Sequence, residues 1–292
     1  MISLAIVVLS LIAAGVGVFW QDGGSSYEFT TLRGETVLIH GRGLYRYDSV
    51  SMAAQAVAQD MVTLLIGIPF LLVSLYYLRR DSLRGKLLFC GITGYFLYTY
   101  MSYAVGANYN NMFLIYVAVF SLSLTALIIA VPSIDLSTLK TQFSEHMPKR
   151  SVVSYLLCIS FLLFMVWMGR IVPAMISCTA PAGLESSTTL FIQFMDLGIV
   201  IPLSVVAGIL LLRNQPLGYL LSSIMIIKTS TLALSVSAMA FNMLLSGADV
   251  APAELIMFPA IAVSGIILMI MMLRSVSETA KQTLRSDDSK NN

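Results

Sequence analysis

Residues 193–242 read QFMDLGIVIPLSVVAGILLLRNQPLGYLLSSIMIIKTSTLALSVSAMAFN, and this stretch decides the fold. Two apolar runs flank the short polar turn Asn214-Gln215-Pro216, which predicts two membrane-spanning helices joined in a tight hairpin. Asp196 lies in the first run and Lys228 near the middle of the second. Charges at bilayer depth are costly, so they usually face a bundle interior and pair with one another. The stretch therefore indicates a multi-pass membrane protein with a polar interior.

The composition of the whole chain agrees with a membrane location. Of 292 residues, 58% are hydrophobic and 11% are charged, and the mean hydropathy is +0.86. Soluble domains carry about a quarter charged residues. The net charge of +2 and the lack of a basic stripe argue against a nucleic-acid partner. We therefore expect the lipid bilayer to be the main partner of this chain.

Neither a metal site nor a cofactor site is expected. The three cysteines, Cys90, Cys158 and Cys178, fit neither a disulfide framework nor a metal motif. His40 and His146 fall in loops on opposite sides of the predicted bundle, and no His-Glu-x-x-His or Gly-x-Ser-x-Gly pattern occurs. The sequence therefore does not favour an enzyme, although it leaves one open.

Eight apolar segments are long enough to span about 30 Å of hydrocarbon. They predict an all-α polytopic bundle with helices near 2–20, 53–78, 86–106, 112–133, 152–176, 189–213, 217–245 and 254–273. The first segment lacks a basic region before it, so we interpret it as a retained anchor and not as a signal peptide. Residues 1–274 then form one transmembrane domain, and the polar residues 275–292 are expected to be a disordered cytoplasmic tail.

The orientation follows from the basic residues in the short loops. One side holds Arg79, Arg80, Arg84, Lys86, Lys140, Lys149, Arg150, Arg213 and Arg274. The loops 108–111, 178–187 and 247–253 on the other side contain no Lys or Arg. Both termini are therefore predicted to be cytoplasmic. The outer loop 21–52 breaks the pattern mildly, because it contains Arg33, Arg42 and Arg46.

The outer loop 21–52 contains a β-hairpin signal. Thr36–His40 and Leu44–Tyr47 read as two short strands, and Gly41-Arg42-Gly43 between them is a typical turn. A solvated hairpin over the helix ends is the favoured interpretation, and a lid is the alternative.

The sequence also contains a pattern of an internal repeat. Arg80 and Arg213 are 133 positions apart, and the same offset relates Pro69 to Pro202, Gly85 to Gly218, and Leu87-Leu88 to Leu220-Leu221. The two copies would begin four helices apart and thus have the same orientation, as in parallel repeats related by an axis along the membrane normal. Chance is the alternative, because leucine matches are common in apolar sequences.

Helical spacing gathers polar side chains on the inward faces of several helices. At 1.5 Å per residue, most of them lie in the outer half of the membrane, with Lys228 and Tyr95 near its middle. The candidate ligand-binding residues are Lys228, Asp196, Asp60, Arg170, Gln59, Gln193, Tyr95 and Tyr98. The alternatives are structural: glutamines can join helices, a long arginine can reach the surface, and a buried ion pair can serve packing alone.

We expect Lys228 and Asp196 to approach within salt-bridge or one-water distance. Counted from Gln215, they differ by six positions along the antiparallel hairpin, which corresponds to an axial offset of about 9 Å. A lysine side chain spans most of that distance, so Asp60 and Tyr95 remain competing partners for Lys228.

The stretches Arg170-Ile-Val-Pro-Ala, Asp196-Leu-Gly and Arg213-Asn-Gln-Pro-Leu-Gly-Tyr-Leu-Leu resemble uncharacterised bacterial multi-pass membrane proteins. The resemblance covers a minor part of the chain and brings no known activity. It implies a bacterial inner-membrane location.

Three hypotheses for function follow from these patterns. The first is a transporter or permease-like protein of the cell membrane, with a polar site for a small polar molecule or ion in the outer half of the bundle. The second is a membrane sensor or assembly factor that binds a ligand or a partner helix without transport. The third is an intramembrane enzyme acting on lipid, with Asp60 or Asp196 as acid or base.

Overall fold

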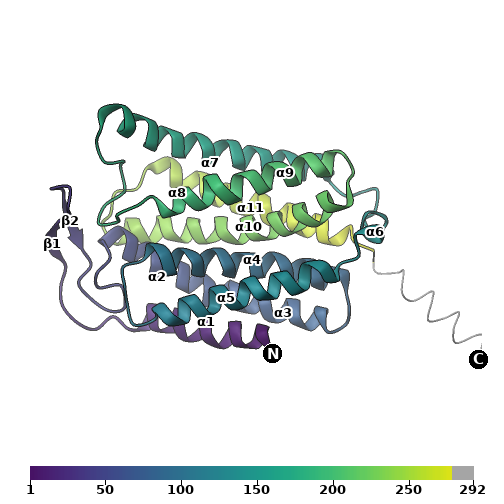
Figure 1. The fold of residues 1–292 in the computed structure, drawn as a ribbon, viewed down its shortest axis with the longest axis horizontal. Coiled ribbons are helices and arrows are strands. Elements are labelled where there is room, and N and C mark those ends of the chain that lie inside the picture. Colours follow the sequence, from purple (N-terminus) through teal and green to yellow (C-terminus); the bar gives the residue numbers. More distant parts are fainter. Residues whose placement is uncertain (278–292) are drawn as a thin grey trace, which may run out of the picture.

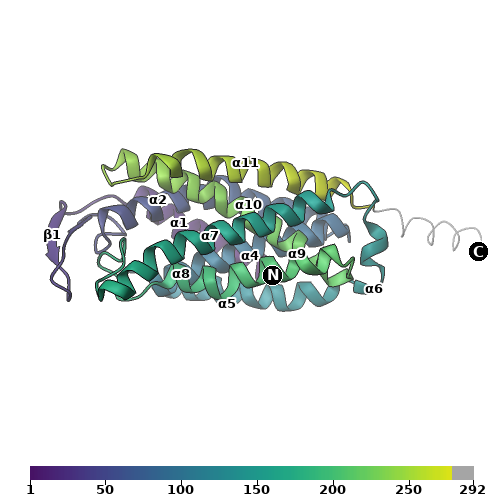
Figure 2. The same cartoon turned by 90° about the horizontal axis from the view of Figure 1, so that it is seen from above.

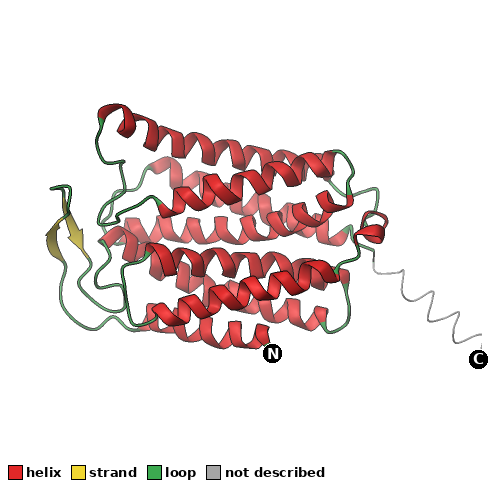
Figure 3. Ribbon diagram, viewed as in Figure 1, coloured by secondary structure: helices red, strands yellow, loops and turns green. Residues whose placement is uncertain are grey.

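The computed structural model describes residues 1–277, and these form one bundle of long helices with a small β-hairpin beyond one end (Figures 1 and 3). We call this the hairpin end, and we call the opposite end, where residue 277 lies, the tail end. The helices are α1 (Ile2–Phe19), α2 (Val50–Val62), α3 (Ile68–Leu78), α4 (Leu83–Gly106), α5 (Phe113–Ala130), the short α6 (Leu136–Leu139), α7 (Lys149–Ser177), α8 (Phe191–Met195), α9 (Ile201–Leu212), α10 (Pro216–Leu245) and α11 (Pro252–Arg274).

Among the described residues, seven helices are long and apolar enough to cross a membrane by length and composition. They identify the chain as a multi-pass membrane protein. The remaining predicted segment, 86–106, corresponds to α4 and is not among these seven. Helix α4 has 24 residues but is less apolar, because it contains several tyrosines and glycines. Figure 2 shows α4 running among the other helices, inside the bundle.

The most enclosed of the seven apolar helices is α10. In its most apolar window 61% of the residues are buried, against 22–39% for the other six helices. Its sequence is also the richest in serine and threonine, with Ser222, Ser230, Thr231 and Ser235 all buried. A helix that is covered by protein on most sides does not need a lipid-compatible surface, which explains why small polar residues are tolerated along it.

Two core clusters share helix α4. The first joins α1, α3, α4 and α5 and is rich in aromatic rings, including Tyr95, Phe96, Tyr100, Tyr103 and Tyr116. The second joins α4, α7, α9, α10 and α11 and is mainly aliphatic. The second cluster lies near the tail end, so the hairpin half of α7 and α11 has less core around it.

The hairpin contains one predicted strand, and its partner strand lies before it in the chain and not after it. Strand β1 (Tyr27–Thr30) pairs antiparallel with β2 (Thr36–Ile39), so that Tyr27 lies opposite Ile39. The predicted strand at Thr36–His40 is therefore present, but the one at Leu44–Tyr47 is wrong, since these residues form turns. Leu44 and Tyr45 are buried against the helix ends, and this packing replaces the expected strand pairing.

The first three residues of the predicted tail are folded. Ser275 and Val276 are buried, and Val276 forms a β-bridge with Phe143. The Arg84 Nη2 donates to the Val276 carbonyl at 2.6 Å, and the Ser277 amide donates to the Gln142 carbonyl at 2.7 Å. Residues 275–277 therefore belong to the folded domain, and the remainder of the predicted tail, 278–292, lies outside the described residues.

Two bends of the chain have the same local geometry. A π-helical turn at Thr63–Gly67 interrupts the span Val50–Leu78, and another at Asp196–Val200 interrupts the span Phe191–Leu212. Proline follows each turn, at Pro69 and Pro202. Proline removes one backbone hydrogen bond and clashes with the preceding helical turn, so a wider turn relieves the conflict. The two turns begin at Thr63 and Asp196, which are 133 positions apart.

The loops that follow these helices match at the same offset. Asp81 and Asn214 both have φ of 54° in the left-handed region. The Ser82 amide donates to the Tyr77 carbonyl, and the Gln215 amide donates to the Leu210 carbonyl, again 133 positions on. A Cβ atom at Gly85 would collide with the backbone of Tyr77 and Leu78, and one at Gly218 would collide with that of Leu210 and Leu211.

Candidate functional site

A cavity of about 570 Å³ lies in the hairpin half of the bundle. Its walls come from α2, α4, α7, α8, α10 and α11, and the loop 178–190 contributes Gly183, Leu184 and Ser187. Most of the lining side chains are apolar, with a small number of polar groups among them. Ligand sites of proteins typically have this size and this mixture of an apolar wall with a few polar groups.

The cavity ends near the middle of the bundle. On α7 its lining extends from Ile159 to Arg170, and on α10 from Thr229 to Met243. Below this level the buried side chains Leu156, Leu211 and Leu220 belong to the aliphatic core cluster. The cavity therefore belongs to the hairpin half, and packed side chains separate it from the tail end.

Asp196 lies at this cavity, on the second π-helical turn. Asp196 is only 5% exposed. One carboxylate oxygen accepts from the Tyr98 hydroxyl at 2.8 Å, and the other accepts from the Trp167 Nε1 at 3.0 Å. Helices α4 and α7 thus each contribute one aromatic donor to a buried carboxylate, and buried polar groups need such partners.

Lys228 lies beside this group, on α10, and is also 5% exposed. Its Nζ atom is 4.0 Å from the centroid of the Tyr98 ring, and it has no hydrogen-bond partner among the described residues. A direct hydrogen bond between Lys228 and Asp196 is therefore absent from the described residues, and their approach within one-water distance stays a prediction. Tyr98 contacts both residues, with its ring face towards the ammonium and its hydroxyl towards the carboxylate.

Asp60 lies apart from the cavity, in the aromatic core cluster. The Tyr45 hydroxyl donates to it at 2.5 Å and the Tyr103 hydroxyl donates at 3.0 Å. The space is so tight that a Cβ atom at Gly17 of α1 would overlap the Asp60 carboxylate. Asp60 is thus a buried acid held by two tyrosines, whereas Asp196 borders an open volume.

Gln59 and Tyr95 belong to a hydrogen-bond network that joins α2, α4 and α10. The Gln59 Nε2 donates to the Tyr95 hydroxyl at 2.6 Å and to the Thr99 hydroxyl at 3.0 Å. The Tyr95 hydroxyl also contacts the hydroxyls of Thr63 at 2.9 Å and Ser235 at 3.4 Å. Gln59 lines the cavity and is 2% exposed, and its Oε1 atom finds no hydrogen-bond partner in residues 1–277.

Arg170 and Gln193 line the part of the cavity nearer the hairpin end. The Arg170 Nη2 lies 3.6 Å from the Glu254 carboxylate of α11. The Arg170 guanidinium also lies 5.4 Å from the centroid of the Trp167 ring. Trp167 therefore contacts Arg170 through its ring and Asp196 through its N–H group.

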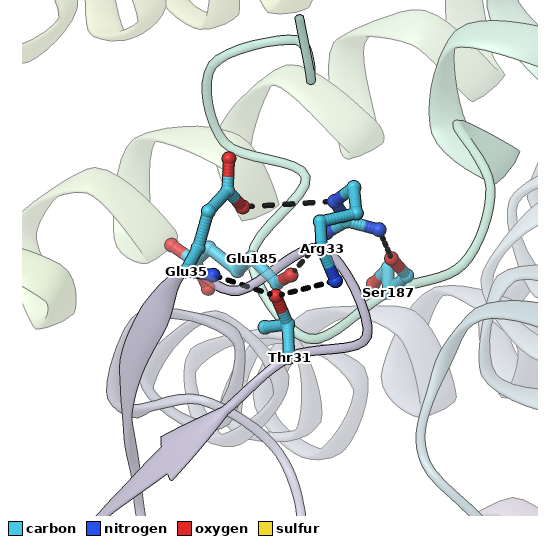
Figure 4. Close-up of polar contacts among 5 residues, drawn as sticks. All are labelled: Thr31, Arg33, Glu35, Glu185 and Ser187. Carbon is cyan, nitrogen blue, oxygen red and sulfur yellow. Dashed lines mark hydrogen bonds and ion pairs between the residues drawn. The ribbon is translucent and has the colours of Figure 1, made fainter.

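The loop 178–190 is fastened to the hairpin (Figure 4). It is also fastened to the start of α2. The Arg33 guanidinium donates to the carbonyls of Glu185 at 2.7 Å and Ser187 at 3.3 Å. The Glu185 carboxylate accepts from the hydroxyl of Ser51 at 2.6 Å and from that of Ser49. Because this loop lines the cavity, we call it the roof loop.

Asp48, just before α2, is another acid at the cavity. Its Oδ1 accepts from the Asn108 backbone amide at 2.9 Å and from the Asn108 Nδ2 at 3.0 Å. Burial raises the pKa of the Asp48 carboxyl to about 6, although the two hydrogen bonds from Asn108 act in the opposite direction.

The structure brings some of the predicted site residues together and leaves others apart. Gln59, Tyr98, Arg170, Gln193 and Asp196 line the cavity, whereas Asp60, Tyr95 and Lys228 are absent from its lining. Sequence reasoning did not identify Trp167, Tyr103 or Glu254 as residues of the site. Trp167 and Arg170 are three positions apart on one helix face, and that spacing is a signal that could have identified Trp167.

Within residues 1–277, no three His, Cys, Asp or Glu side chains come together as metal ligands. The groups available at the cavity are therefore carboxylates, amides, a guanidinium and aromatic rings, which suit reversible binding of a small molecule. The sequence matches no protein-family model, no curated protein and no solved structure.

Proposed function

We propose that this chain is a transporter or permease-like protein that binds a small molecule in the cavity of its hairpin half. The observation that carries the proposal is the cavity itself, because it borders the buried Asp196 and is walled off from the tail end. A bundle with a polar site near its middle and access from one side only has the form of one state of an alternating-access cycle.

The proposal includes eight membrane-spanning helices in two parallel halves, with the hairpin end outside the cell membrane and both termini in the cytoplasm. The matched π-helical turns, prolines and positive-φ residues at an offset of 133 support the two halves. On this division α1 to α5 form the first half and α7 to α11 the second. The basic residues of the tail-end loops support the orientation.

The two halves differ in their interiors. Tyrosine rings fill the first half around Asp60, whereas the second half is hollow around Asp196. Transport by rocking of one half against the other needs a site at the boundary between the halves. The cavity meets this requirement, because α2 and α4 of the first half line it together with four helices of the second.

A cysteine-accessibility experiment tests transport without a known substrate. Ser223 of α10 is fully buried in the tail half, and its hydroxyl donates to the Tyr219 carbonyl at 2.7 Å. In a background of Cys90→Ala and Cys158→Ala, we expect Ser223→Cys to react slowly with an impermeant thiol reagent applied from the tail side. This reaction requires the bundle to open towards that side.

Two positions serve as controls in the same membranes. Native Cys178 is exposed on the roof loop, and Val236 lines the cavity. Both Cys178 and a Val236→Cys variant should react from the hairpin side only in the resting protein. If Ser223→Cys never reacts from the tail side while both controls react normally, the transporter hypothesis is wrong.

A sensor that binds a ligand without transport is the second candidate. The aliphatic core cluster of the tail half favours it, since its packed side chains close the cavity on that side. The same cysteine experiment separates the two functions, because a sensor keeps the tail half closed.

A further inference from the structure

The charged groups that line the cavity are mainly acidic, and they favour a ligand that is positively charged. Three carboxylates line it, those of Asp48, Asp196 and Glu254, against one cation, Arg170. Arg170 already lies beside Glu254 at 3.6 Å, and Asp48 already accepts two hydrogen bonds from Asn108. Asp196 also accepts two hydrogen bonds, from Tyr98 and Trp167, but these donors are neutral and it forms no salt bridge among the described residues, so its charge remains available to a ligand in the deeper part of the cavity.

Gln59 provides an independent sign of the same preference. Its Nε2 atom uses both hydrogens on Tyr95 and Thr99, whereas its Oε1 atom has no partner among the described residues although Gln59 is 98% buried. An unsatisfied buried acceptor destabilises the protein. A ligand that donates a hydrogen bond at this point would remove that destabilisation.

Aromatic rings surround these acceptors. Tyr98, Tyr103, Trp167, Phe191 and Phe258 all line the cavity. The face of an aromatic ring attracts cations such as ammonium groups. The protein already uses the Tyr98 ring in this way, because the Lys228 ammonium lies 4.0 Å from its centroid.

We propose that the cavity binds an organic ammonium ion with an apolar body. Its ammonium donates hydrogen bonds to the Asp196 carboxylate and the Gln59 Oε1, and its apolar part contacts the aromatic and aliphatic walls. The proposal rests on the cavity that the proposed function uses, and it adds the chemical class of the ligand. It holds for a transporter and for a sensor alike.

Lys228 has a defined part in this arrangement. In the empty cavity its ammonium is the positive charge that neighbours Asp196 through Tyr98. A bound ammonium would bring a second positive charge near Asp196 and would be weakly repelled by Lys228. Removal of the Lys228 charge should therefore tighten ammonium binding while it destabilises the empty protein, because Asp196 then loses its neighbouring cation.

Three probes of similar shape test the class of ligand on the full chain in detergent: 2-phenylethylammonium, 3-phenylpropanoate and 2-phenylethanol. Trp20 and Trp167 are the two tryptophans of the chain, so a Trp20→Phe variant leaves Trp167 as a fluorescent reporter at the cavity. At about pH 7, where the amine is protonated, we expect the ammonium to bind at least about tenfold more tightly than the other two. Equal or tighter binding of the carboxylate or the alcohol would overturn the proposal.

Variants then test whether the Asp196 carboxylate supplies the negative charge that binds the ammonium. Asp196→Asn should weaken ammonium binding by about tenfold or more, and Asp135→Asn, at an exposed acid of the tail end, should leave it unchanged. Lys228→Met should have a lower melting temperature than the parent chain and should regain more of it than the parent does when 2-phenylethylammonium is added. If Lys228→Met weakens ammonium binding, the role given to Asp196 is wrong. The probe comparison on the Trp20→Phe chain decides the proposal even where a variant fails to fold.

The two proposals can fail separately. Ammonium binding without reaction of Ser223→Cys from the tail side would leave a sensor of organic cations. Reaction of Ser223→Cys without preference for the ammonium probe would leave a transporter of another ligand class.

Discussion

Alanine in place of Gly85 or Gly218 tests the matched bends directly. Each glycine is the third residue of its helix, and each lies against the backbone of the preceding helix. A Cβ atom at Gly85 would lie 2.6 Å from the Tyr77 carbonyl carbon, whereas ordinary contact begins at 3.4 Å. The two helices must therefore separate by roughly 0.8 Å, and backbone atoms cannot move aside as a side chain can. Gly218 faces the same obstacle from Leu210 and Leu211.

The expected cost follows from this overlap. Overpacking of a well-filled region costs about 1–3 kcal/mol. Replacement of glycine by alanine at an open helical position instead gains up to about 1 kcal/mol. Gly169 in the middle of α7 is such a position, because nothing lies within 4 Å of its Cβ site. We therefore expect Gly85→Ala and Gly218→Ala to be less stable than Gly169→Ala by about 1–4 kcal/mol.

Equilibrium unfolding of the three variants in the same detergent measures the difference. The reasoning requires losses of similar size at Gly85 and Gly218, because their surroundings are alike. It is refuted if either variant is as stable as Gly169→Ala. A loss at one glycine alone would show that the two bends are not equivalent.

Three further predictions concern the hairpin end. Burial raises the pKa of Asp48 from 3.8 to about 6, so its contribution to stability is full below about pH 3.8 and is lost as the pH rises through about 6. The free energy of unfolding should therefore fall relative to that of Asp48→Asn by up to about 3 kcal/mol over this range, and a pH-independent difference would contradict the assignment. Native Cys178 should react with an impermeant thiol reagent applied to intact cells, and reaction only after the cells are opened would reverse the proposed orientation. Glu185→Ala removes the hydrogen bonds from Ser49 and Ser51, so amide hydrogen exchange of the roof loop should become faster by about tenfold; unchanged exchange would show that these bonds do not hold the loop.

Much of the fold follows from the lengths of the apolar runs and the residues that end them. The predicted segment 217–245 corresponds to α10 (Pro216–Leu245), which begins directly after the polar turn. The sequence predicts that α4 begins near residue 86, three residues after its observed start at Leu83, because basic residues such as Arg84 are typical of a cytoplasmic loop. In the structure Ser82 caps the helix through the Gly85 amide, and Arg84 reaches the Val276 carbonyl. Such a contact across 192 positions leaves no local pattern.

The site was harder to predict, because the contacts of a side chain depend on the rotation of its helix about the helix axis and not only on its depth in the membrane. The axial offset of about 9 Å between Lys228 and Asp196 anticipated that the two would not fit together easily. It could not show that Tyr98 contacts both residues. The π-helical turn at Asp196–Val200 also changes the direction in which Asp196 points, and proline six positions later is only a weak signal of such a turn. Trp167 comes from a helix that is distant in sequence.

The paired π-helical turns bear on the ancestry of the chain. A π-helical turn holds one more residue than an α-helical turn, and the same insertion at matched positions is hard to acquire twice. On the proposed duplication, the extra residue was therefore present before the gene doubled. The ancestor was then a protein of four helices that already carried this kink and that assembled with a second copy in the same orientation. On the same proposal, one copy later filled its interior with tyrosine rings, and the other kept its interior open beside an acid.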